Sequence, residues 1–170
     1  MNTYKLTLLA ILAALAVVGR FVFSFLPNVQ PVTAIIIVCG LFLGPLAAII
    51  LAILTAFLSN MLLGIGLWTI WQVVGWGIIG LISGVIGKYM KVSILPIIIF
   101  AIFSGYFYGF IISLTTYQVT GMFWPYYVAG LPFDTYHAIG NGIFIAFLYP
   151  TMSYFLKKYA NKRFFLYNTN

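Results

Sequence analysis

The sequence predicts an all-α integral membrane protein, a bundle of six transmembrane helices with almost no soluble part. Of its 170 residues, 64% are hydrophobic and only 5% are charged, whereas a soluble domain carries about 25% charged residues. The apolar runs are continuous rather than alternating, which favours helices over a membrane barrel. Since one span needs about 20 apolar residues, we expect residues 1–170 to form a single transmembrane domain.

The helices are expected where apolar stretches are bounded by proline, glycine or basic residues. The predicted ranges are about 4–25, 32–43, 46–63, 68–89, 94–117 and 133–159.

Prolines and glycines set the first three boundaries. Pro27 and Pro31 cannot both continue a helix, so the first helix ends before them. The short second helix stops at Gly44-Pro45, and the third stops at the glycine-rich turn 64–66.

Charge and polarity set the last three boundaries. The fourth helix ends in the basic turn 88–91. We expect a polar and aromatic connection over 118–132 between the fifth and sixth helices, and a kink in the sixth at Pro150.

The basic residues predict the orientation. They are Lys5, Arg20, Lys88, Lys91, Lys157, Lys158, Lys162 and Arg163. With six spans, all but Arg20 fall on the side that holds both termini, and cytoplasmic loops carry the excess of Lys and Arg. We therefore expect a multi-pass protein of the cell membrane with cytoplasmic termini. Because these charges mark topology and form no basic stripe, nucleic acid is not an expected partner.

Polar and aromatic side chains gather on the opposite, outer side. Polar groups at membrane depth are costly, so they suggest function. We expect a ligand cavity there, and the candidate substrate-binding residues are Arg20, Asn28, Gln30, Asn60, Trp68, Trp71, Gln72, Trp76, Tyr126, Asp134, His137 and Asn141.

Two features of this set allow alternative interpretations. The indoles of Trp68, Trp71 and Trp76 lie roughly along one helical face, where they either form an interfacial aromatic belt or stack on a ligand. Arg20 and Asp134 either form an ion pair that closes the mouth of the bundle, or Arg20 meets an anionic ligand group. Both alternatives stay open at this point.

The sequence favours binding over catalysis. It has one acid, Asp134, and therefore no carboxylate pair, and it shows no nucleophile with a base and no phosphate-binding glycine loop. One histidine, one cysteine and one acid in different spans are too few for a metal site. We expect no enzyme activity, no metal and no cofactor.

Four ordered segments resemble a known family. The segments 5–14, 27–35, 40–47 and 68–72, with the length and topology, are similar to the substrate-binding membrane subunit, or S component, of an energy-coupling factor (ECF) vitamin transporter. The resemblance extends over essentially the whole chain. It implies a prokaryotic membrane subunit that binds a vitamin-like solute at the outer face under a gate of two connections.

The resemblance also implies partners. Ala10 and Ala14 are spaced as in the family's alanine motif, which contacts the coupling transmembrane subunit. Two cytoplasmic ATPases would power import, during which the whole subunit topples in the lipid bilayer. The segments 27–31 and 68–72 look closest to a cobalamin-type subgroup, and pantothenate, whose carboxylate could meet Arg20, is the next candidate.

Two other classes of function compete with this hypothesis. A stand-alone channel or secondary transporter needs intramembrane ionisable groups or an internal repeat, which the sequence does not show. A non-transport assembly or sensor subunit predicts no small-molecule binding.

Overall fold

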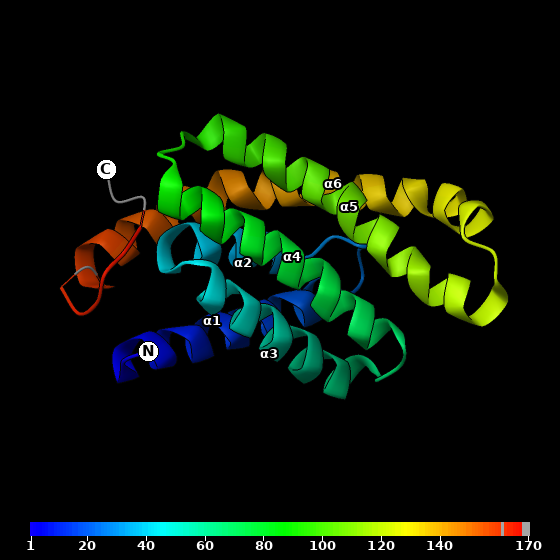
Figure 1. Ribbon diagram of the computed structural model, residues 1–170, viewed down its shortest axis with the longest axis horizontal. Helices are drawn as coiled ribbons and strands as arrows, with labels where there is room; N and C mark the ends of the chain where they lie inside the picture. The colour runs from blue at the N-terminus through cyan, green and yellow to red at the C-terminus, as the bar shows by residue number, and fades with distance from the viewer. Residues whose placement is uncertain (161, 168–170) are drawn as a thin grey trace.

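The computed structural model describes residues 1–160 and 162–167. These residues form an all-helical bundle (Figure 1). Its helices are α1 Thr3–Val22, α2 Val32–Leu43, α3 Pro45–Leu63, α4 Trp68–Tyr89, α5 Ile94–Thr120 and α6 Trp124–Phe155, followed by the short π-helix η1 Leu156–Ala160.

Within this described part, five helices are long and apolar enough to cross a membrane, and α2 is the shorter sixth. The architecture confirms the predicted membrane bundle.

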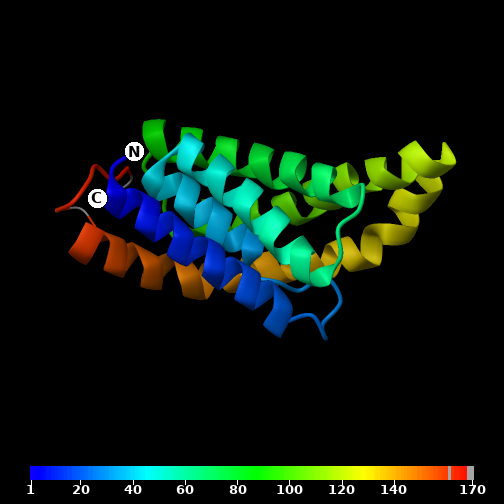
Figure 2. The same ribbon diagram turned by 90° about the horizontal axis from the view of Figure 1, so that it is seen from below.

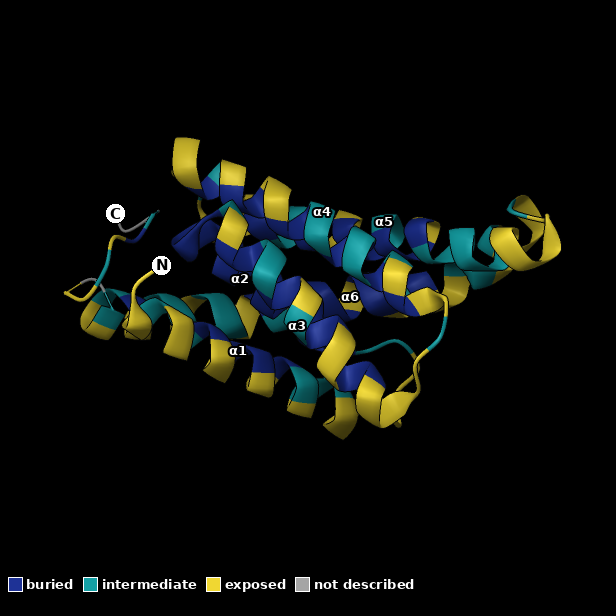
Figure 3. Cartoon of the chain, turned by 60° about the horizontal axis from the view of Figure 1, so that its bottom comes forward, coloured by how far each residue is buried: buried dark blue, intermediate teal, exposed yellow. Residues whose placement is uncertain are grey.

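The short helix α2 forms the centre of the bundle. Its 12 residues are all buried, and at about 1.5 Å per residue it is only about 18 Å long, less than the hydrocarbon core of about 30 Å. A helix that is apolar all round is stable only when it is surrounded. Helices α3, α4 and α6 pack around it (Figure 3), so the other elements are positioned relative to α2.

Small residues allow the central helices to approach closely. A Cβ added at Gly84 in α4 would meet the backbone of Pro45, and one added at Gly105 in α5 would meet the backbone of Ala138 in α6. These small-residue positions therefore serve packing inside the bundle. Ala10 and Ala14 differ, because both are exposed on the outer face of α1.

The connections divide between the two ends of the bundle. Both termini lie at one end, together with the α2–α3 and α4–α5 turns, and the α1–α2, α3–α4 and α5–α6 connections lie toward the other end (Figures 1 and 2). The segment 162–167 folds back on the terminal end, where the Tyr167 N–H donates to the Phe42 carbonyl at 2.9 Å.

The structure corrects three predicted boundaries, one of which is the end of α5, at Thr120 rather than near residue 117. Helix α1 ends at Val22 rather than near residue 25. Helix α6 begins at Trp124, well before the predicted start at Phe133. The expected connection 118–132 therefore shrinks to residues 121–123.

Local chemistry explains the longer helices. Gly121 has a φ of 73° and ends α5 in the left-handed conformation that glycine adopts easily. Pro125 stands in the first turn of α6, where no backbone N–H is needed. Pro132, which had suggested a loop, lies inside α6.

Candidate functional site: a polar cavity at the end of the bundle opposite the termini

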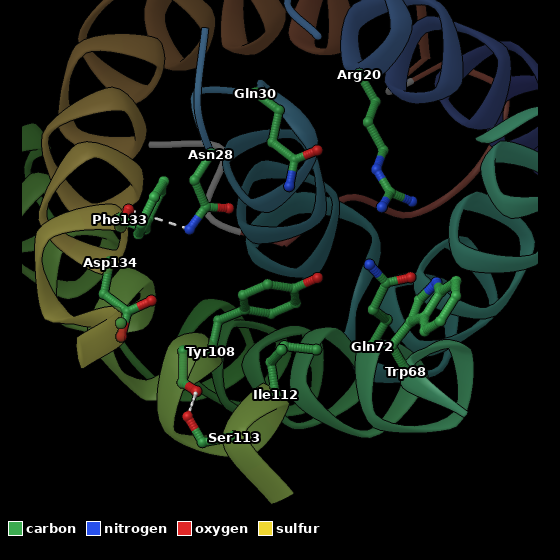
Figure 4. A pocket seen from close by; sticks show the side chains of 12 residues that line it. Arg20, Asn28, Gln30, Trp68, Gln72, Tyr108, Ile112, Ser113, Phe133 and Asp134 are labelled. Carbon is green, nitrogen blue, oxygen red and sulfur yellow. Dashed lines mark hydrogen bonds between the residues drawn. The ribbon is translucent and has the colours of Figure 1, made fainter. Parts of the chain in front are cut away.

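A cavity of about 340 Å³ opens between helices that are distant in sequence. Its walls come from α1, the α1–α2 connection, α4, α5 and α6 (Figure 4). The lining residues are Arg20, Asn28, Gln30, Trp68, Gln72, Tyr108, Gly109, Ile112, Ser113, Gly130, Phe133 and Asp134.

One wall presents hydrogen-bond donors, and buried Asn60 organises it. The Asn60 Oδ1 accepts from Nη1 of Arg20 at 2.9 Å, and its Nδ2 donates to Oε1 of Gln72 at 2.7 Å and to Oγ1 of Thr69 at 2.8 Å. Nη1 of Arg20 also donates to the Ser59 hydroxyl. Since the Gln72 oxygen is used by Asn60, its Nε2 is the donor to the neighbouring Tyr108 hydroxyl, and the second Nε2 proton is left to donate to a ligand.

The opposite wall presents acceptors. The carboxylate of Asp134 lies directly over Gly109, where an added Cβ would clash with it. The Asn28 Nδ2 donates to the Phe133 carbonyl at 3.1 Å, which leaves the Asn28 Oδ1 available as an acceptor. The cavity is therefore polarised, with donors on the α1 and α4 side and acceptors on the α6 side.

The sequence left open whether Arg20 and Asp134 form an ion pair, and the structure holds the two groups apart. Arg20 and Asp134 line different sides of the cavity (Figure 4). Among the described residues, Arg20 is held by the neutral side chains of Ser59 and Asn60, and no ion pair joins it to Asp134. Both charged groups can therefore meet a ligand.

Stacked aromatic rings form the base of the cavity. Tyr108 stacks on Trp76 with ring centroids 4.9 Å apart, and it contacts the His137 ring at 5.1 Å. The Arg20 guanidinium carbon lies 5.5 Å from the Trp76 ring centroid. Trp76 and His137 are completely buried behind Tyr108, so of these three rings Tyr108 is the one that lines the cavity.

The twelve predicted site residues fall into three groups. Six line the cavity: Arg20, Asn28, Gln30, Trp68, Gln72 and Asp134. Three lie buried behind the lining: Asn60, Trp76 and His137.

The other three predicted residues lie away from the cavity. Trp71 donates from its indole N–H to Oε1 of Gln118 at 2.9 Å. Tyr126 is 47% exposed. Asn141 is buried between α5 and α6, where its Nδ2 donates to the Ala101 carbonyl at 3.3 Å.

Sequence reasoning missed half of the lining, namely Tyr108, Gly109, Ile112, Ser113, Gly130 and Phe133. Four of these lie in the apolar helix α5, where no single polar residue stands out. The other two lie in the first third of α6, which was expected to be mostly loop. The one usable signal was the small residue Gly109 directly after Tyr108 in a predicted span.

The fold and the cavity define a class. A helical membrane bundle with a polarised cavity near one end is suited to hold a small polar solute within the membrane. Residues 1–104 match the family described as ECF-type riboflavin transporter, S component. This match covers more than half of the chain, and the chain therefore belongs to the S components of ECF transporters. No solved structure matches it.

Membership of the family sets the general role. S components are substrate-binding transporter subunits rather than enzymes, and they take up vitamin-type substrates with an ECF module. The match supports the S-component prediction, but it does not support the cobalamin-type subgroup.

Proposed function

We propose that this chain captures riboflavin, or a vitamin of similar size and polarity, in the 340 Å³ cavity and delivers it to an ECF module for import. The observation that carries the proposal is the polarised cavity, in which Arg20 and Gln72 face Asp134 across Tyr108. A flavin offers carbonyl oxygens on a planar ring and hydroxyl groups on its side chain. The carbonyls suit the donor wall, the hydroxyls suit the acceptor wall, and the ring suits stacking on an aromatic side chain.

The size of the cavity favours a compact vitamin. Cavities of about 300 to 1,000 Å³ hold drug-sized ligands, and this one lies near the lower end of that range. A corrinoid is much bulkier, so we do not propose cobalamin, which the sequence resemblance had suggested. Pantothenate remains the second candidate, because its carboxylate suits Arg20 and its hydroxyl groups suit Asp134.

The partners follow from the same proposal. The coupling transmembrane subunit would dock on the exposed alanines, Ala10 and Ala14, and two cytoplasmic ATPases would supply the energy. The excess of basic residues at the end that holds the termini supports a cytoplasmic position for that end in a prokaryotic cell membrane. The cavity would then open outward.

An uptake assay tests the dependence on partners. Proteoliposomes would contain either the chain alone or the chain with its coupling subunit and ATPases, with ATP inside, and uptake of radiolabelled riboflavin would be measured. We expect uptake only when the whole module and ATP are present. Uptake at the full rate by the chain alone would overturn the proposal in favour of a stand-alone transporter.

A further inference from the structure

A chain of buried hydrogen bonds ties the α1–α2 connection, residues 23–31, to the middle of the bundle. The Trp76 Nε1 donates to Oγ1 of Thr33 at 3.0 Å. The same oxygen lies 3.0 Å from Nε2 of His137, and Nδ1 of His137 lies 2.9 Å from the backbone carbonyl of Asn28. The Trp76, Thr33 and His137 side chains are completely buried, so water does not compete for these bonds.

The donor and the acceptor of each hydrogen bond in this series can be assigned. An indole N–H can only donate, so Thr33 Oγ1 accepts from Trp76. A carbonyl can only accept, so Nδ1 of His137 must hold a proton and donate to Asn28. A neutral imidazole then has Nε2 as an acceptor, which receives the single hydroxyl proton of Thr33. The geometry thus assigns one tautomer to His137.

Asn28, whose carbonyl accepts the last of these hydrogen bonds, has an unusual backbone conformation. Among the described non-glycine residues, Asn28 is the one with a positive φ, 58°. Asparagine is enriched in this region of backbone conformation. The Asn28 carbonyl faces His137, and the Asn28 side chain donates to the Phe133 carbonyl at 3.1 Å. Both the backbone and the side chain of Asn28 therefore attach the connection to α6.

The other end of the chain reaches the cavity. Trp76 stacks on Tyr108, which lines the cavity, and it lies under the guanidinium of Arg20. A ligand that contacts Tyr108 and Arg20 therefore touches two residues that pack directly on the first donor of the chain, Trp76. Asn28, at the far end of the chain, also lines the cavity.

We propose that Thr33 and His137 are positioning residues, which do not touch the ligand but hold the 23–31 segment in place beside the cavity and so govern ligand retention. This inference rests on the proposed function for its effect on a ligand. Its structural part, the bond chain itself, can be tested without one.

A matched pair of threonine variants tests the role. Thr33 and Thr55 are both completely buried, but Thr55 Oγ1 has no hydrogen-bond partner in the described structure. In the free protein, we expect Thr33→Val to speed hydrogen exchange of the Val29 amide, which donates to the Leu26 carbonyl at 3.3 Å, about tenfold, as expected for loss of a buried hydrogen bond. Thr55→Val should leave it within about twofold. Equal exchange in the two variants would overturn the positioning role.

The single histidine allows a direct spectroscopic test. Because the chain has one His, the protein labelled with ¹⁵N-histidine gives one pair of ring nitrogen signals. We expect Nδ1 protonated and Nε2 unprotonated in the wild type. The Nε2-protonated tautomer would overturn the assigned bond chain.

Two histidine variants add a rescue test. An asparagine amide places its nitrogen near the position of Nδ1, whereas a glutamine amide reaches toward Nε2. His137→Asn should therefore slow exchange of the Val29 amide better than His137→Gln, and the reverse order would contradict the proposal. For a bound vitamin, we expect Thr33→Val to raise the dissociation rate about tenfold. Unchanged dissociation with faster exchange would refute the link to retention, whereas no binding by the wild type would instead refute the proposed function.

Discussion

At the scale of single residues, Asn60 shows how one amide can organise a binding wall. A buried polar group is stable only when it is paired, and Asn60 uses its oxygen for Arg20 and both amide protons for Thr69 and Gln72. This pairing fixes the orientation of Gln72 and leaves its Nε2 as a donor. The specificity of the cavity is thus set partly by a residue that does not line it.

Two neighbouring residues on α4 give a test at this scale. Gln72→Ala removes a donor from the cavity, and the loss of one hydrogen bond of about 1 kcal/mol should weaken vitamin affinity five- to tenfold. Trp71→Ala serves as the control, because its indole bonds to Gln118 outside the cavity. Isothermal titration of both variants checks this, and a larger loss of affinity in Trp71→Ala would contradict the position of the site.

At the scale of elements, close contacts between helices depend on glycines without space for a side chain. In α4, a Cβ at Gly84 would collide with the Pro45 backbone, whereas a Cβ at Gly77 meets nothing within 4 Å. The two glycines lie in the same helix. Comparing the same substitution at both positions therefore separates the effect of packing from that of helix propensity.

The two substitutions to alanine should therefore change the free energy of unfolding in opposite directions. Gly84→Ala forces helices apart and should lower the free energy of unfolding by about 1–3 kcal/mol. Gly77→Ala should raise it by about 0.5–1 kcal/mol, since alanine loses less backbone entropy in a helix. Thermal unfolding in one detergent measures both, and destabilisation by Gly77→Ala alone would refute the α3–α4 packing described above.

The outer face of α1 gives a prediction about the partner. If Ala10 and Ala14 form the docking surface, the double variant Ala10→Trp/Ala14→Trp should abolish import in the reconstituted module and leave vitamin affinity within about twofold. A matched control is Ile99→Trp/Phe103→Trp, which has the same spacing on an exposed face of α5. Equal loss of import in both variants, or loss of binding in the first, would contradict a docking role.

The sequence predicted these elements well wherever composition alone decides them. Continuous apolar stretches and their flanking proline and glycine residues located α2, α3 and α4 closely. The start of α6 was missed because Pro125, Pro132 and the polar aromatic residues between them are typical of a loop. In the structure, Pro125 stands at a permitted position in the first turn, and Pro132 is accommodated within the helix.

At the scale of the whole molecule, the site forms where residues that are distant in the sequence come together. Polar residues in a membrane protein are conspicuous in the sequence, which is why Arg20, Gln72 and Asp134 could be predicted as candidates. Tyr108 and Gly109 could not, because their role depends on how α5 packs against α4 and α6. The polarity of the cavity, with donors facing acceptors, appears only when the hydrogen bonds are known.

The two ends of the molecule differ in polarity and charge. The cavity is lined from the end that holds the α1–α2 connection, and seven of the eight basic residues lie toward the other end, with the start of α1 and the segment 162–167. If the cavity holds the ligand, capture takes place at the end of the bundle opposite the basic residues.

The central claim is that the cavity binds a compact vitamin. The most direct test is the thermal stability of the detergent-purified protein with riboflavin, pantothenate or cobalamin, each at a series of concentrations. A ligand that binds only the folded state stabilises it by about 2.7 kcal/mol at 100 times its dissociation constant. We expect a saturable rise in stability with riboflavin, reduced in Gln72→Ala. Stabilisation by cobalamin alone, or by none of the three, would contradict it.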